Sequence, residues 1–380
     1  MKSVVVHGQP SFKVASTSVE AFVTQQAGML SPVNFKLKGQ TVQPFQVAPW
    51  AMNGEEIDKG LPPLLHALRG DFFCLPFGGN ETAYKGERHP PHGETANSKW
   101  STAKISETDG VHELRMSLNT KVRKGRVEKL VRVVDGHNAV YQKHTVTGMS
   151  GPMSPGHHAI LQLPDEPECG RISTSPIQYG QVLPFPFENP EIGGYHALKP
   201  GGRFKSLRKV PANSGGHFDL SRYPARRGFD DLSLVVNKPG ASFTWTAVTF
   251  PKQRYAFFTL KDPRMLKSTA FWMSNGGRHY HPWDGRHINV LGIEDVTANF
   301  HIGLAESVKT NPLSKLGYPT RINIRAKKPL VVNYIMGMCS IPAGFDEVKS
   351  IKAAKDNTIL LTSLNGKRAK AKVDSDFLTS

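Results

Sequence analysis

The sequence predicts an all-β protein built as a large antiparallel β-sandwich. Short segments in which apolar and polar residues alternate recur along most of the chain, which is typical of strands with one buried face. The 35 glycines and 28 prolines are spread between these segments, where turns are expected. No amphipathic pattern is longer than about two helical turns, and no repeat of fixed period is present.

Composition supports a folded chain with a substantial core. Hydrophobic residues make up 38% and charged residues 21% of the 380 positions, which is not the profile of a disordered protein. This length suits one large β domain or two ordinary domains. We expect a main β-sandwich domain over residues 1–341 and a small, basic β appendage over 342–380 that packs on it.

The first third of the chain contains the clearest strand signals. Residues 1–50 alternate weakly and predict several short strands, and residues 51–68 predict a loop with one helical turn after Pro63. Strands are expected at 112–120, 127–134 and 139–148. Asp135-Gly136 between the last two predicts a tight hairpin, because both residues tolerate the positive φ of such turns.

The second half alternates between long loops and strands. Residues 151–215 are rich in proline and glycine and predict long loops around short strands, and loops of this length are often functional. Strands resume at 232–237, 242–250, 255–260, 269–274, 290–296, 321–326 and 330–338. Asn365-Gly366 predicts another hairpin near the C-terminus.

The N-terminal residues lack the apolar core of a signal peptide, and no apolar run approaches the roughly 18 residues that span a bilayer. Cys74, Cys169 and Cys339 are widely spaced and form no C-x-x-C motif, so reduced thiols are expected. We therefore expect a soluble cytoplasmic protein that does not associate with a membrane. The oligomeric state is left open.

The formal net charge is +17. The basic residues are scattered, and their densest groups, at 121–126, 201–209 and 367–372, lie on no helical pattern and are not interleaved with aromatic residues. A solvated basic surface is the simplest interpretation. Attraction of an anionic or phosphorylated sugar is a second interpretation, and nucleic acid is not expected as a partner.

Several polar residues lie in apolar or glycine-rich surroundings. Arg69 begins R-G-D-F-F-C-L-P-F-G, and His92 lies in P-P-H-G, where proline stiffens the backbone and glycine allows close approach of a ligand. His157 and His158 precede an apolar run. Because adjacent strand residues face opposite sides, only one of these two histidines can face a given pocket.

Glu294 is an acid within the apolar segment V-L-G-I-E-D-V. A buried carboxylate is costly unless it is paired, so it has either a structural partner or a catalytic role with a raised pKa. Asp230 and Asp231 in F-D-D-L are further candidates.

The segment 278–287, R-H-Y-H-P-W-D-G-R-H, permits three interpretations. It is a pocket-lining loop in which Trp283 stacks on a sugar, a plain surface loop, or a metal site formed by its histidines. We expect no metal, because the segment is loop-like and supplies no further ligand on a rigid element.

Four segments in matching order resemble the galactose mutarotase-like superfamily, which contains the aldose 1-epimerases and the glucose-6-phosphate 1-epimerase-like proteins. R-G-D-F-F-C-L-P-F-G resembles the family's arginine-glycine strand. H-P-P-H-G-E-T-A-N-S-K-W resembles its histidine-glycine loop. G-H-H-A-I resembles its second histidine segment, and I-E-D-V-T-A-N-F resembles the strand with the catalytic glutamate. The resemblance covers about residues 20–340.

The resemblance implies a β-supersandwich and a mutarotase that interconverts the anomers of a hexose or sugar derivative, with no metal and no cofactor. Glu294 would take the proton of the anomeric hydroxyl, and His158 would protonate the ring oxygen. Arg69, His92 and Asp230 would hold the sugar hydroxyls, with Asp231 as an alternative to Asp230.

The sequence also departs from the family pattern. Asp295 replaces the proline that usually follows the glutamate, and E-T-A replaces the residues that often follow His-Gly. The insertion at 164–215 and the C-terminal appendage are not constant in the family. These departures leave room for an alternative function, a non-catalytic carbohydrate-binding protein with the same fold.

Overall fold

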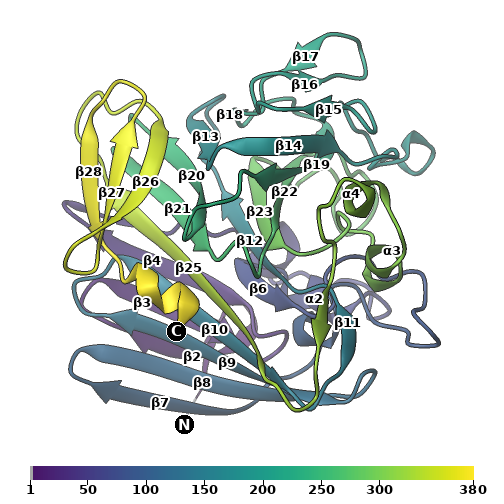
Figure 1. The fold of residues 1–380 in the computed structure, drawn as a ribbon, viewed down its shortest axis with the longest axis horizontal. Coiled ribbons are helices and arrows are strands. Elements are labelled where there is room, and N and C mark those ends of the chain that lie inside the picture. Colours follow the sequence, from purple (N-terminus) through teal and green to yellow (C-terminus); the bar gives the residue numbers. More distant parts are fainter. Residues whose placement is uncertain (1–2) are drawn as a thin grey trace.

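The computed structural model describes residues 3–380 and shows two large antiparallel sheets packed face to face (Figure 1). The predicted all-β sandwich is therefore confirmed. The larger sheet has 12 strands in the order β1-β2-β3-β4-β6-β12-β23-β22-β19-β14-β15, with β5 paired to β4. Their bounds are β1 Val4–Val6, β2 Gln9–Ala15, β3 Val19–Thr24, β4 Leu30–Leu37, β5 Gln40–Val42, β6 Asp71–Cys74, β12 Gly156–Gln162, β14 Ile177–Val182, β15 Arg203–Phe204, β19 Phe229–Asn237, β22 Ser268–Asn275 and β23 Val290–Val296.

The second sheet has 9 strands in the order β18-β13-β20-β21-β25-β10-β9-β8-β7. Their bounds are β7 Ser101–Thr108, β8 Val111–Thr120, β9 Gly125–Val134, β10 Ala139–Thr147, β13 Gly170–Thr174, β18 Arg222–Tyr223, β20 Thr244–Phe250, β21 Tyr255–Lys261 and β25 Leu330–Ser340. The β9–β10 hairpin turns at Asp135-Gly136, as predicted. Two small ribbons complete this part of the fold, β11 (Gly151–Met153) with β24 (Ile322–Ile324) and β16 (Val210–Pro211) with β17 (His217–Phe218).

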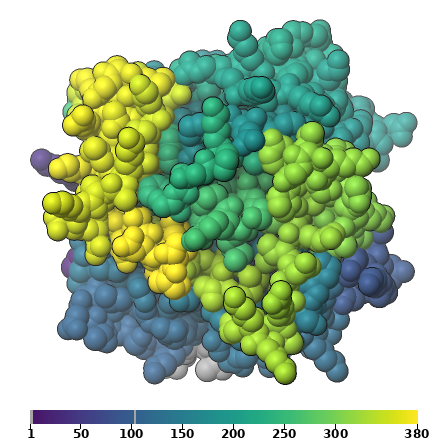
Figure 2. All heavy atoms as spheres, in the orientation of Figure 1, coloured from purple at the N-terminus to yellow at the C-terminus, as the bar shows by residue number. Residues whose placement is uncertain are grey.

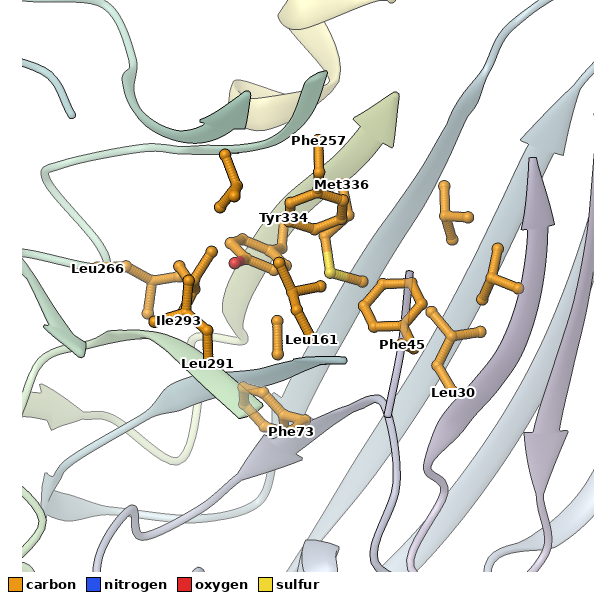
Figure 3. Close-up of a cluster of buried hydrophobic side chains, with 14 of the residues drawn as sticks. Leu30, Phe45, Phe73, Leu161, Phe257, Leu266, Leu291, Ile293, Tyr334 and Met336 are labelled. Carbon is orange, nitrogen blue, oxygen red and sulfur yellow. The ribbon is translucent and has the colours of Figure 1, made fainter. Parts of the chain in front are cut away.

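The main hydrophobic core lies between the two sheets. Figure 3 shows part of it, where Phe73 and Ile293 of the larger sheet lie near Phe257, Tyr334 and Met336 of the second sheet. The alternating pattern of the sequence explains this arrangement, because every second side chain of a strand points to the same face. Burial of these apolar side chains provides the main driving force for the sandwich.

Short helices and loops cover the other face of the larger sheet, and a second buried cluster forms beneath them. The helices are α1 (Pro49–Met52), α2 (Pro63–Ala67), α3 (Leu304–Val308) and α4 (Pro312–Lys315), with 3-10 turns at η1 (Glu94–Ala96) and η2 (Pro190–Ile192). The cluster includes Trp50 of α1, Leu64 of α2, Phe72 of β6 and Trp272 of β22. The helical turn expected after Pro63 is confirmed as α2.

The C-terminal residues form a separate sheet of β26 (Val348–Ala354), β27 (Thr358–Ser363) and β28 (Arg368–Lys372), followed by η3 (Ser375–Thr379). They lie together at one side of the molecule (Figures 1 and 2). Ile351 and Leu361 share a buried cluster with Trp245 and Phe258, on the face of the second sheet turned away from the sandwich core. The hairpin at Asn365-Gly366 is confirmed, and the division of the chain at residue 341 stays a prediction.

Within residues 3–380, no helix has the length and apolar character needed to cross a membrane.

Candidate functional site

A cavity of about 200 Å³ lies on the helix-covered face of the larger sheet. Strands β6, β12, β19, β22 and β23 form its floor, and α2 and the loops around residues 91, 187, 278–283 and 301 form its walls. The lining residues are Pro62, Leu64, Leu65, Leu68, Phe72, Pro91, His92, His158, Phe187, Leu232, Trp272, Arg278, Trp283, Glu294 and His301.

Glu294 and His158 form a direct pair in this cavity. The two residues are opposite one another in the antiparallel register of β12 and β23, so their side chains project from the same face. His158 Nε2 lies 3.2 Å from Glu294 Oε1, and both side chains are buried. Phe72, the neighbour of His158 on β6, stacks on the imidazole with 4.6 Å between ring centroids and thereby orients it.

Burial moves the pKa values of this pair in opposite directions. Burial raises the pKa of Glu294 to about 8, although Arg278 opposes the shift. Burial also lowers the pKa of His158 well below its usual value, with a further contribution from His92. At neutral pH these shifts favour the uncharged forms, a carboxylic acid beside a neutral imidazole, so the pair holds one acidic proton.

Strand alternation sends the neighbours of this pair to the opposite face. His157 Nδ1 lies 2.9 Å from Asp71 Oδ2 in the core between the sheets, and its ring stacks on Tyr334. Asp295 forms an ion pair with Lys261 at 2.6 Å in the same core. The sequence left His157 and His158 as alternatives, and the structure brings His158 to the cavity.

His92 reaches the cavity from a loop held by two asparagine side chains. Asn97 Nδ2 donates to the carbonyls of Pro91 and Gly93, and Asn80 Nδ2 donates to the carbonyl of Pro90. His92 has a φ of 58° and Gly93 a φ of 76°. A Cβ on Gly93 would lie 2.1 Å from the carbonyl oxygen of Leu75, so only glycine allows this close passage.

Arg278 is the cationic group of the cavity. Its Nε lies 2.6 Å from Glu188 Oε1 and 3.4 Å from Asp230 Oδ2. Burial opposes the charged guanidinium, but the two carboxylates outweigh it and raise the pKa of Arg278. The guanidinium carbon also lies 4.6 Å from the centroid of the Trp283 ring, so aromatic and ionic contacts together hold it in place.

The sequence matches no protein-family model and no curated protein. Solved structures, however, are similar over most of the chain. A Klebsiella pneumoniae protein provisionally named an aldose 1-epimerase aligns with a TM-score of 0.62 at 12% identity, over 87% of this chain and 79% of that one. The chain has the galactose mutarotase-like fold. A galactose mutarotase related enzyme from Lactobacillus acidophilus aligns with a TM-score of 0.55 at 14% identity, over 90% of this chain and 100% of that one.

An aldose epimerase homologue from C. elegans aligns with a TM-score of 0.55 at 11% identity, over 88% of this chain and 100% of that one. The resemblance found in the sequence is thus confirmed at the level of fold. At these identities the mutarotase-like fold does not by itself assign an activity, so we infer the function from the residues of the cavity.

Arg69 does not reach the cavity of this mutarotase-like fold. Its guanidinium is fully buried and donates to the backbone carbonyls of Val6, His7 and Ala67, at 2.9–3.0 Å. These bonds attach the N-terminal strand β1 to the segment that follows α2. We therefore give Arg69 a structural role and omit it from the proposed site.

Asp230 does not line the cavity but contacts residues that do. Its carboxylate accepts hydrogen bonds from Trp272 Nε1 and the backbone N–H of Gly277, and it lies beside Arg278. Burial raises the pKa of Asp230 to about 6. Asp231 faces the other way and accepts from the N–H groups of Ala197 and Leu198. Neither aspartate lines the cavity, but Asp230 contacts two residues that do, Arg278 and Trp272.

Trp283 does line the cavity, as one interpretation of the segment 278–287 suggested. His287 from the same segment is buried against Trp272 and hydrogen bonds to Ser274 Oγ through Nδ1. His281 lies at the surface. Among residues 3–380, no group of three or more histidine, cysteine or acidic side chains is placed to hold a metal ion.

Two polar cavity residues were not singled out in the sequence. Arg278 is the first residue of the segment 278–287, and the only sequence signal for it is that it shares this segment with Trp283. His301 follows the glutamate strand by only a few residues. Burial lowers the pKa of His301 to about 4, so it faces the cavity as a neutral imidazole.

Proposed function

We propose that the protein is an aldose 1-epimerase-like isomerase that interconverts the anomers of a sugar. The proposal rests on one observation above all, the Glu294–His158 pair in the cavity. Anomer exchange requires a base that removes the proton of the anomeric hydroxyl and an acid that protonates the ring oxygen. A singly protonated carboxyl–imidazole pair supplies both functions without another group.

The acid and the base of this pair are adjacent in the cavity. Adjacency suits the reaction because the anomeric oxygen and the ring oxygen are bonded to the same carbon. Glu294 would accept the anomeric proton as His158 donates one to the ring oxygen. The bond between the anomeric carbon and the ring oxygen then breaks, leaving an open-chain aldehyde.

Reclosure on the other face of the aldehyde returns both protons. For Glu294 to act as base, its proton must first move to His158, whose Nε2 lies 3.2 Å from Glu294 Oε1. Arg278 lowers the pKa of both groups, so its charge stabilises the carboxylate and opposes the imidazolium that this step forms. Trp283 and His92 would position the sugar ring, and Arg278 would also donate to a sugar oxygen.

The proposal is tested by dissolving a pure anomer and following its conversion by polarimetry or NMR exchange, with the spontaneous rate subtracted. A panel of hexoses, deoxy sugars, sugar phosphates and uronic acids is needed, because the fold does not name the sugar. Protein-dependent exchange on at least one of them is expected. Binding of a sugar without exchange would instead support the non-catalytic alternative.

The proton shared by the pair gives the reaction a defined pH dependence. Because the pKa of Glu294 is about 8 and that of His158 lies well below 6.5, the pair keeps one proton from about pH 6.5 to about pH 8. We expect kcat/KM to be constant over this range. Above pH 8 it should fall about tenfold per pH unit, as the last proton is lost. A rate that rises through pH 8 would show that Glu294 acts as a base without the shared proton.

A further inference from the structure

One part of the cavity wall is formed by a single chain segment that presents only apolar side chains to the cavity. Within residues 62–68, the residues that line the cavity are Pro62, Leu64, Leu65 and Leu68, whereas His66 is not among them. Leu64 and Leu68 are buried, and Leu65 is partly exposed. A sugar hydroxyl facing this wall would lose its hydrogen bonds to water and gain no side-chain partner in return.

Other sides of the cavity are also apolar. Phe187, Leu232, Trp272 and Trp283 line it together with Phe72 and Pro91. Aromatic rings bind the C–H faces of a sugar well, but they supply few partners to hydroxyl groups. The apolar lining therefore extends well beyond the α2 segment.

The polar groups of the cavity are few and partly engaged. Glu294 and His158 are needed for the proposed chemistry, which leaves Arg278, His92 and His301. His92 Nδ1 already lies 3.5 Å from Cys74 Sγ. Sugar hydroxyl groups that face these three side chains can find partners, whereas those that face the apolar wall cannot.

The charges around the cavity do not favour an anionic ligand. Arg278 is the cationic residue that lines it, and Glu188 and Asp230 both lie beside its guanidinium. Among the described residues that surround the cavity, carboxylates therefore offset the arginine charge. A phosphate or carboxylate on the sugar would lack an uncompensated positive partner here.

We propose that the substrate of this site is a neutral sugar hemiacetal with few free hydroxyl groups, such as a deoxy or O-methylated sugar. This inference rests on the proposed function and specifies its substrate class. The apolar segment 62–68 would contact the part of the sugar that lacks hydroxyl groups.

The test compares matched sugars in the anomer-exchange assay. D-Glucose is compared with its 2-deoxy, 3-deoxy and 6-deoxy forms, D-galactose with 6-deoxy-D-galactose, and glucose 6-phosphate and glucuronate are included. At least one deoxy sugar is expected to show a kcat/KM about 10- to 100-fold above that of its parent, the range that one unmatched hydroxyl supplies. The two anionic sugars should be the poorest substrates.

The inference is overturned if a parent hexose or an anionic sugar exchanges at least as fast as every deoxy form. In that case the proposed function still stands. Absence of exchange on every sugar would overturn both. The variant Leu65→Asn, which adds a hydrogen-bonding group to the wall, should reduce the deoxy-to-parent ratio several-fold. Leu65→Met keeps the wall apolar and should preserve the ratio. Equal ratios in the two variants would also contradict the inference.

Discussion

Glu294→Gln is expected to lower kcat for anomer exchange by about 10²–10⁴-fold, the usual contribution of a positioned acid or base. Glutamine has nearly the same shape, so the cavity and its apolar contacts remain. It cannot take up and return a proton, and the shared proton of the pair is lost. Sugar binding, measured by calorimetry or NMR titration, should survive within a few-fold.

Glu81→Gln is a suitable control for this variant, because Glu81 is exposed and does not line the cavity. It makes the same chemical change at the surface and should keep the wild-type rate. Comparison of melting temperatures separates loss of catalysis from loss of fold. Wild-type turnover by Glu294→Gln would show that another group is the base.

Asp295→Asn, one residue further along β23, is expected to affect stability instead. Asp295 accepts hydrogen bonds from Thr259, Thr269 and Tyr334 and forms the buried ion pair with Lys261. Removing its charge leaves the ammonium of Lys261 buried without a counter-charge. Loss of one partner of such a pair typically costs about 3–5 kcal/mol, which should appear in the unfolding free energy measured in urea.

The double variant Lys261→Met with Asp295→Asn provides the matched test. Removing the second charge should recover at least about 1 kcal/mol of the loss, because no isolated buried charge remains. A cost below about 1 kcal/mol for Asp295→Asn alone would contradict the assigned role. Two adjacent acids on one strand thus have separate predicted roles, one in proton transfer and one in the core.

The fold could be predicted because its determinants are local. Alternating residues define strands, and Asp135-Gly136 and Asn365-Gly366 define hairpins without reference to distant parts of the chain. The order of strands within each sheet could not be predicted from local sequence, because β6, β12 and β23 pair across long sequence separations. Only the resemblance to a known family supplied that information.

The candidate site was predicted in part. His92, His158, Trp283 and Glu294 meet at one cavity, consistent with their unusual local surroundings. Arg69 does not, because its partners are backbone carbonyls of β1 and the adjoining turn, and no pattern around Arg69 indicates them. A charged residue in an apolar sequence setting is expected to have a partner, but the sequence does not show which residue that partner is.

The apolar wall of the cavity could not be predicted from the sequence for a related reason. Residues 62–68 resemble an ordinary loop with a helical turn, and their leucines could equally pack in a core. Their place beside the Glu294–His158 pair depends on how α2 packs over β6 and β22. That tertiary arrangement, rather than any motif, gives the wall its proposed effect on substrate choice.

Proton transfer to and from the sugar is proposed to take place at Glu294 and His158. This proposal is tested most directly by a crystal structure of Glu294→Gln soaked with the best exchanging sugar. We expect a ring in the cavity with its anomeric oxygen within hydrogen-bond distance of residue 294 and its ring oxygen near His158 Nε2. A sugar bound outside this cavity, or with its anomeric carbon turned away from both residues, would contradict it.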